Sequence, residues 1–169
     1  RQYSTNTYGW TRWVFDYIKL SPPEAQILEI GCGPCDLWLQ NLERIPDDWA
    51  IFLSDLSPGM IEKGQNLLFD RAQRFTFQNF DAQDIPHDDN SLDTVIANHM
   101  LYHVPHLDRG LAEIQRVLKP TGRLYAATNG ANHMKEMRAL RQKFLNLIGP
   151  SGNHGSTPGT TSTVDTQSS

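Results

Sequence analysis

The stretch that decides the fold is Gln26-Ile-Leu-Glu-Ile30, followed by Gly31-Cys-Gly-Pro-Cys35. Branched apolar side chains in a run of this length are typical of a buried strand. The glycines that follow predict a tight turn, because glycine adopts positive φ angles without a steric penalty. A helix is expected from about Asp36 to Arg44, so the stretch predicts one strand–turn–helix unit.

The same unit recurs along the chain. Further strands are expected over 50–54, 75–80, 92–97 and 123–128, and further helices over 8–20, 57–69, 107–118 and 132–148. This alternation predicts an α/β fold with a doubly wound, mostly parallel sheet and helices on both faces. We expect an N-terminal lid helix over 1–20, a core domain over 21–150 and a flexible tail rich in Gly, Ser and Thr over 151–169.

Composition excludes several classes of protein. The chain has 169 residues, of which 38% are hydrophobic and 20% are charged, and these values are ordinary for one soluble domain. A net charge of −4 argues against a nucleic-acid partner. The sequence contains neither an apolar run of membrane-spanning length nor a secretory leader, so a cytoplasmic protein without a membrane span is expected.

Polar residues follow the first two expected strands, where a sheet of this kind binds its ligands. Gly31 and Gly33 would let a ligand touch the backbone, with amide groups of the following helix end aimed at it. A dinucleotide fingerprint needs a third glycine where Asp36 stands, and a carboxylate there would repel a pyrophosphate, so NAD is disfavoured. Asp55 can accept hydrogen bonds from both hydroxyls of a ribose, because Ser57 is the expected N-cap of the next helix.

Two further strand ends add polar groups. After the third strand, Asp81 could accept a hydrogen bond from an exocyclic amine of a base. After the fourth, His99 and His103 are four residues apart, and His106 follows. No local cysteine or acid completes a ligand set with these histidines, so no metal site is predicted.

Five segments in order resemble the class I S-adenosylmethionine-dependent methyltransferases, in particular those related to the ubiquinone and menaquinone biosynthesis enzymes. These segments are ILEIGCGP (27–34), LSDLSPGM (53–60), FDAQDIP (80–86), SLDTVIANHMLYHV (91–104) and RVLKPTGRLYAATNG (116–130). The resemblance covers roughly residues 8–148. It implies S-adenosylmethionine as cofactor, S-adenosylhomocysteine as product, and methyl transfer to a small-molecule acceptor by in-line displacement that depends mainly on positioning.

The resemblance also implies roles for individual residues. The cofactor would contact Glu29, Gly31, Cys32 and Gly33 with its methionine end, Asp55 with its ribose, Leu56 and Met60 beside the adenine, Asp81, Ala82 and Gln83 at the edge of the base, and Asn98 at the amino group. Tyr3, Tyr8 and Trp10 are candidates for a lid. His99, Tyr102 and His103 are expected to face the acceptor, and any of them could serve as a base. The competing interpretation for these histidines is a structural hydrogen bond at a helix start.

The sequence departs from the family at two places. Cys35 stands where the family usually has a third glycine, and a cysteine adopts a positive φ angle only at a cost. Two strands that usually follow the fifth are missing, so the chain is expected to be truncated at its C-terminus, and an exposed fifth strand would invite a homodimer.

Two alternatives stay open. The first is a cofactor-binding module that lacks turnover because the C-terminal substrate wall is missing. The second is a thiol–disulfide oxidoreductase, because Cys32-Gly-Pro-Cys35 has the letters of the thioredoxin active site and a helix N-terminus would lower a cysteine pKa.

Overall fold

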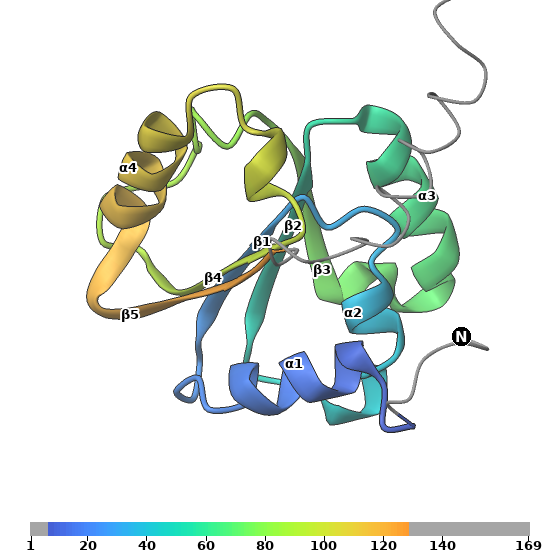
Figure 1. Cartoon of the computed structure of the whole chain (residues 1–169). Helices are drawn as coiled ribbons and strands as arrows, with labels where there is room; N and C mark the ends of the chain where they lie inside the picture. Colours follow the sequence, from blue (N-terminus) through green and yellow to red (C-terminus); the bar gives the residue numbers. More distant parts are fainter. Residues whose placement is uncertain (1–6, 129–169) are drawn as a thin grey trace, which may run out of the picture. The chain divides into compact units, whose positions relative to one another are not determined.

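The computed structural model describes residues 7–128, and these form five parallel strands in one sheet (Figure 1). The strands are β1 (Gln26–Ile30), β2 (Ala50–Asp55), β3 (Phe75–Asn79), β4 (Leu92–Asn98) and β5 (Leu118–Ala127). Their order is β3-β2-β1-β4-β5. β2 and β3 are added on one side of β1, and β4 and β5 on the other, so the strand order reverses between β1 and β4. This order confirms the predicted doubly wound fold, and it places the expected ligand site at the carboxyl ends beside β1.

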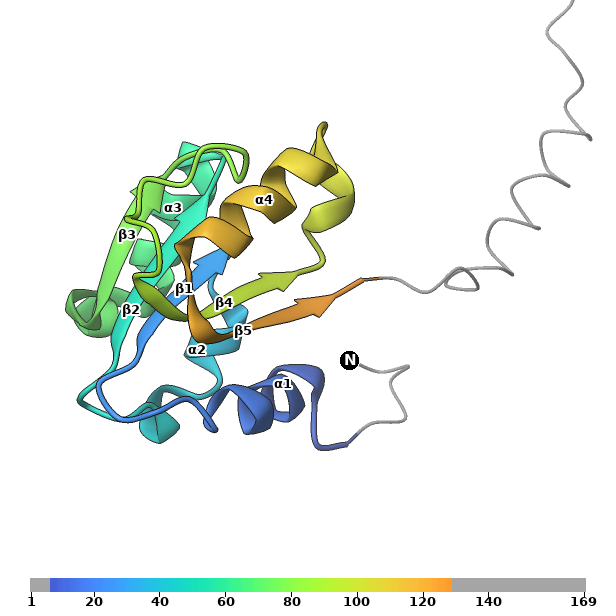
Figure 2. The ribbon, with the colours of Figure 1, turned by 90° about the vertical axis from the view of Figure 1, so that its left-hand side faces the viewer.

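Helices cover both faces of the sheet. They are α1 (Trp10–Ile18), α2 (Asp36–Leu39), α3 (Pro58–Leu68) and α4 (Leu107–Val117), with 3-10 turns η1 (Leu42–Arg44), η2 (Phe69–Arg74) and η3 (Leu101–His103). Figure 2 shows α1 and α4 on opposite sides of the sheet. A hydrophobic core lies on each face of the sheet, and neighbouring residues of β1 point into different cores. Ile27 packs in one core with Phe15 and Trp38, whereas Leu28 packs in the other with Ile114.

The expected helix 36–44 is divided into α2 and η1, and a buried side chain explains the break. The side chain of Asn41 donates its Nδ2 hydrogen bond to the carbonyl of Leu37 at 2.7 Å. In a continuous α-helix this carbonyl would pair with the Asn41 amide. That amide instead donates to the Trp38 carbonyl at 2.9 Å, which is the tighter spacing of a 3-10 turn.

The fifth strand begins earlier than the expected residue 123. Leu92 of β4 pairs with Leu118, whereas Thr94 pairs with Arg123, so residues 119–122 lie opposite the single residue Asp93 and form a bulge in β5. Within the described residues β5 lies at the edge of the sheet, as expected for the fifth strand. The expected helix 132–148 and the tail 151–169 lie outside the described residues. Among residues 7–128, no helix has the length and apolar character needed to cross a membrane.

Candidate functional site

A cleft of about 460 Å³ lies at the carboxyl ends of β1 and β2 and beside the segments that follow β3 and β4. Its volume is in the range of small-molecule sites. The cleft brings together seven of the predicted site residues, namely Gly31, Asp55, Leu56, Asp81, Ala82, His99 and His103. The remaining lining residues are Ile30, Ser57, Phe80, Met100, Val104 and Pro105.

The glycine turn after β1 has the left-handed backbone that its sequence predicts. The φ angle is +69° at Gly31, +52° at Gly33 and +62° at Cys35. A Cβ atom at Gly31 would lie 2.7 Å from the Cβ of Met100, so only glycine fits beneath this side chain. A Cβ at Gly33 would meet no atom of residues 7–128 within 4 Å, so a ligand has room to approach the backbone there.

Two amide groups of this turn are bonded within the protein. The Cys32 amide donates to the Ser54 carbonyl at 2.9 Å, and the Gly33 amide donates to Asp55 Oδ2 at 3.0 Å. α2 has only four residues, so it provides little helix dipole at this position. The turn therefore shapes the cleft and holds Asp55.

Asp55 is fixed at the cleft by two backbone groups. Besides the bond to Gly33, its Oδ1 accepts a hydrogen bond from the Ser57 amide at 2.9 Å. Ser57 is the N-cap residue of α3, as predicted, although its side chain forms no capping hydrogen bond with the described residues. Each carboxylate oxygen of Asp55 has a second lone pair for a ligand.

Asp81 is also held as an acceptor. Its Oδ1 accepts from the Gln83 amide at 2.9 Å, and the Gln83 side chain donates Nε2 to Oδ2 at 2.9 Å. These bonds keep the pKa of Asp81 below its ordinary value. The carboxylate is therefore ionised at neutral pH, while the buried Gln83 side chain lies behind it and does not line the cleft.

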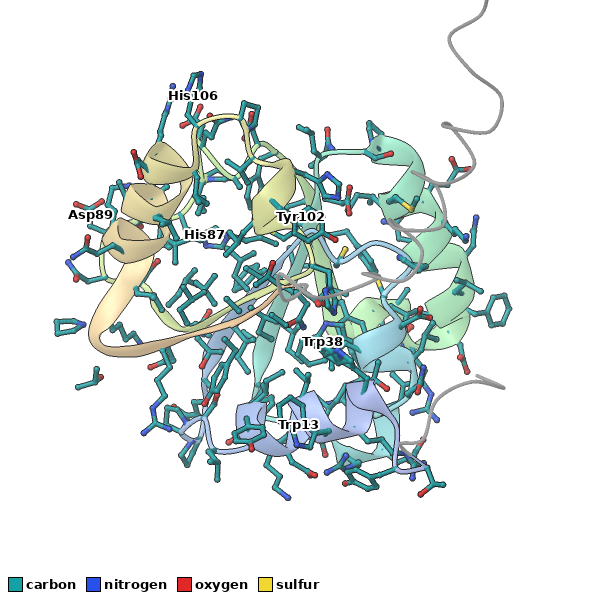
Figure 3. All side chains as sticks on the ribbon, in the orientation of Figure 1. Trp13, Trp38, His87, Asp89, Tyr102 and His106 are labelled. Atoms are coloured by element: carbon teal, nitrogen blue, oxygen red, sulfur yellow. The ribbon has the colours of Figure 1, made fainter. Side chains whose placement is uncertain are left out.

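Glu29 lies beneath the cleft and not on its wall. Its side chain is only 3% exposed, and Oε2 accepts a hydrogen bond from Trp38 Nε1 at 2.6 Å (Trp38 is labelled in Figure 3). Burial raises the pKa of Glu29 to about 8, although hydrogen bonds from Trp38 and Asn98 act in the opposite direction. Asn98 lines a neighbouring groove of about 250 Å³ between α1 and β5.

Of the three candidate bases, two histidines line the cleft. The His99 backbone has a φ angle of +54°, and its amide donates to the Ala127 carbonyl at 2.8 Å. Tyr102 is exposed on the segment between β4 and α4 (Figure 3), and its ring packs against His103 at 4.4 Å between centroids. Tyr102 is thus near the cleft without lining it.

The remaining predicted residues lie farther from the lining. Met60 is exposed in the first turn of α3, and Cys32 and Gly33 form the turn behind Asp55. The Tyr8 hydroxyl donates to Asp16 Oδ2 at 2.8 Å. Tyr3 lies outside the described residues.

Comparison with known proteins identifies the family. The methyltransferase domain family matches residues 28–126, which is more than half of the chain. The chain belongs to the methyltransferase domain family. This result confirms the resemblance to the methyltransferases and S-adenosylmethionine as the cofactor of the family.

Named relatives are similar over part of their length. A demethylmenaquinone methyltransferase from Symbiobacterium thermophilum is 32% identical over 118 residues, which are 68% of this chain and 47% of the relative. A ubiquinone/menaquinone biosynthesis C-methyltransferase from Paraburkholderia phymatum is 33% identical over 102 residues, which are 60% of this chain and 42% of the relative. The chain therefore spans less than half the length of these two relatives.

A solved structure has the same fold. The crystal structure of the [4+2]-cyclase SpnF superimposes with a TM-score of 0.62 and 26% identity, covering 69% of this chain and 42% of SpnF. SpnF is named as a cyclase, so a chain with this fold need not transfer a methyl group. The reaction therefore has to be tested separately from cofactor binding.

The residues of the cleft fit the cofactor of a methyltransferase domain. Asp55 and Asp81 are acceptors at two different strand ends, which suits a ligand with ribose hydroxyls and an amino group on its base. Leu56 and Phe80 provide apolar surface for a flat ring. The negative charge of the two carboxylates favours a cation such as a sulfonium.

The two cysteines do not have the properties of a reactive pair. Both thiols are free and buried. The hydrogen bond with Cys35, and then burial, raise the pKa of Cys32 far above its ordinary value. This direction is opposite to the expected effect of a helix N-terminus, and it disfavours the thiolate that disulfide exchange requires.

Part of the lining escaped the sequence analysis. Ser57 and Phe80 are direct neighbours of predicted residues, so the strand-end rule could have found them. Met100 and Val104 line the cleft because η3 turns the chain back over Gly31, and no local pattern in the sequence indicates this turn.

Proposed function

We propose that this chain binds S-adenosylmethionine in the cleft and transfers its methyl group to a small molecule. One observation carries the proposal: the cleft gathers Gly31, Asp55 and Asp81 from three strand ends in a chain of the methyltransferase domain family.

Each carboxylate has a separate task in this proposal. Asp55, held by two backbone amides, accepts hydrogen bonds from the ribose hydroxyls. Asp81 accepts a hydrogen bond from the exocyclic amine of the adenine. When bound, the cofactor supplies an electrophilic methyl group on a sulfonium. The protein acts mainly by holding both partners in line, because orientation alone can be worth about 7–11 kcal/mol of the barrier.

The acceptor that we propose is a small flat ring methylated at carbon. The names of the two relatives support this class of acceptor. Ring contacts also run from the cleft to the neighbouring groove: His99 lies 5.2 Å from Trp10, which lies 6.4 Å from Trp13 in the groove. Flat rings pack favourably against such aromatic side chains. His99 or His103 would accept a proton if the acceptor must lose one.

Calorimetric titration in reducing buffer tests cofactor binding. We expect saturable one-site binding of S-adenosylmethionine and of S-adenosylhomocysteine. Asp55→Asn should weaken binding by about 10- to 100-fold, the range for losing one hydrogen bond to a charged group. Asp70→Asn, the same change at an exposed position in η2, is the matched control and should leave affinity unchanged. If neither ligand binds the parent chain, the proposal is wrong.

Transfer is tested by mass spectrometry with a demethylated quinol as acceptor. A methylated product together with S-adenosylhomocysteine supports the full proposal. Binding without product supports the alternative of a cofactor-binding module. Cofactor binding that survives replacement of both cysteines by alanine would show that binding requires neither the thiols nor a disulfide.

A further inference from the structure

Gln83 joins two segments that line the cleft. One segment follows β3 and contains Asp81, and the other follows β4 and leads into α4 at His106, which is labelled in Figure 3. Gln83 Nε2 donates to both carboxylate oxygens of Asp81, at 2.9 and 3.1 Å. Gln83 Oε1 accepts a hydrogen bond from the His106 amide at 3.2 Å.

The backbone of Gln83 is fixed as well. Its amide donates to Asp81 Oδ1 at 2.9 Å, and its carbonyl accepts a hydrogen bond from Arg109 Nε at 2.8 Å. The residue is only 9% exposed. Its side chain is therefore committed to protein partners and does not face a ligand in the cleft.

An amide side chain satisfies both partners. An ionised carboxylate accepts hydrogen bonds but cannot donate them, and a backbone N–H donates but cannot accept. The group between Asp81 and His106 must therefore donate at one end and accept at the other. Glutamine has this combination, and its length spans the two segments.

From this geometry we infer that Gln83 is a positioning residue that sets the selectivity of the cleft for a base with an exocyclic amine. It does so by presenting Asp81 as a fixed acceptor at the edge of the base. The inference rests on the proposed binding of S-adenosylmethionine, and it replaces the expected direct contact between Gln83 and the cofactor with an indirect role through Asp81.

The chemistry of the fixed carboxylate explains the selectivity. A ligand with an N–H group that can donate to the free lone pairs of Asp81 gains a hydrogen bond to a charged group and binds more tightly. A ligand without this group leaves the carboxylate without a partner for those lone pairs after water is excluded. For one hydrogen bond to a charged group, we expect the discrimination to be about 10- to 100-fold.

The test compares two ligands on each protein by calorimetry. The first ligand is S-adenosylhomocysteine, and the second is its 6-deamino analogue, which has purine in place of adenine. Gln83→Glu keeps an acceptor for the His106 amide. It puts a second carboxyl group against Asp81, so the hydrogen bond from the Gln83 side-chain amide to Asp81 is lost. Gln73→Glu, the same change at an exposed position in η2, is the matched control.

We expect the parent and Gln73→Glu to prefer S-adenosylhomocysteine by about 10- to 100-fold. In Gln83→Glu this ratio should fall at least fivefold, mainly through weaker binding of S-adenosylhomocysteine. The ratio of two affinities measured on one sample does not depend on the fraction of folded protein. A general loss of structure would therefore not imitate the effect. Gln83→Met removes the side-chain hydrogen bonds to both Asp81 and His106, and it should lower the ratio as well.

The outcomes separate the two proposals. If the parent binds neither ligand, the proposed function fails. If the parent binds and discriminates but Gln83→Glu and Gln83→Met keep the full ratio, the role of Gln83 is wrong and the proposed function stands. If Asp81→Asn keeps the ratio while Gln83→Glu loses it, Gln83 does not act through Asp81, and the inference is also wrong.

Discussion

At the scale of single residues, the most unusual position is Cys35. Its φ angle of +62° belongs to the left-handed region, which costs a non-glycine residue about 1–2 kcal/mol. The side chain is fully buried, and its Sγ packs directly against Gly64 of α3. Replacing Cys35 thus changes two things at once, the backbone strain and the packing of the sulfur.

Two variants separate these effects. Both Cys35→Gly and Cys35→Ala lose the sulfur, but only glycine relieves the backbone, so we expect Cys35→Gly to be more stable than Cys35→Ala by about 1 kcal/mol. Urea unfolding in reducing buffer measures the difference. At Cys32, whose φ angle is not positive, the order should be reversed, with alanine the more stable replacement. Equal stabilities of the two Cys35 variants would show that the strain is not significant.

The residues of the site could be predicted where a strand end points directly at the cleft. Asp55 and Asp81 were found in this way. Partners that only the tertiary fold brings together could not be predicted. The Gly33 amide that binds Asp55 lies 22 residues before it, and the His106 amide that binds Gln83 lies 23 residues after it.

At the scale of elements, a hydrogen-bond network fastens α1 to α2. Asn41 is almost fully buried and donates to the carbonyls of Leu37 and Thr11, at 2.7 and 3.3 Å, while its Oδ1 accepts from Arg44. Arg44 also pairs with Asp16 of α1. Helix α1 of the expected lid over 1–20 therefore packs as part of the core, and closure of Tyr3, Tyr8 and Trp10 over the cofactor stays a prediction.

Removing the buried amide should loosen this junction. We expect Asn41→Ala to lower the free energy of unfolding by about 1–3 kcal/mol, because buried carbonyl groups lose their donors. Chemical denaturation measures the loss, and hydrogen exchange should show faster exchange in α1. Asn66→Ala, on the exposed side of α3, should change stability by no more than about 0.5 kcal/mol. A neutral Asn41→Ala would mean that α1 is held by its apolar contacts alone.

The elements were largely predictable because each strand and helix has its own apolar period. The predicted bounds of helices and strands are wrong where a side-chain hydrogen bond or a bulge changes the backbone pairing. Asn41 ends α2 by taking the Leu37 carbonyl, and the bulge over 119–122 extends β5 through a segment that reads as a turn. Pairing of β5 with a second copy of the chain stays a prediction, which the molar mass in solution would test.

At the scale of the whole molecule, one buried carboxyl group links stability to pH. The pKa of Glu29 is about 8 in the folded protein, raised mainly by burial from its ordinary value of 4.5. Between these two values the folded state holds a proton that the unfolded state has released. Stability contributed by this group is therefore complete below pH 4.5 and is lost as the pH rises through about 8.

Replacing this carboxyl group with an amide should remove the dependence. The side-chain amide of a Glu29→Gln variant can still accept the Trp38 hydrogen bond, but it has no proton to lose in this pH range. The stability of the variant relative to the parent should therefore increase with pH between about 5 and 7.5, by up to about 1.4 kcal/mol per pH unit. Urea unfolding at several pH values measures this slope, and Glu62→Gln, at an exposed position of α3, should follow the parent throughout. Parallel curves for Glu29→Gln and the parent would mean that Glu29 is ionised in the folded protein, and that a negative charge is already present beneath the cleft before any cation binds.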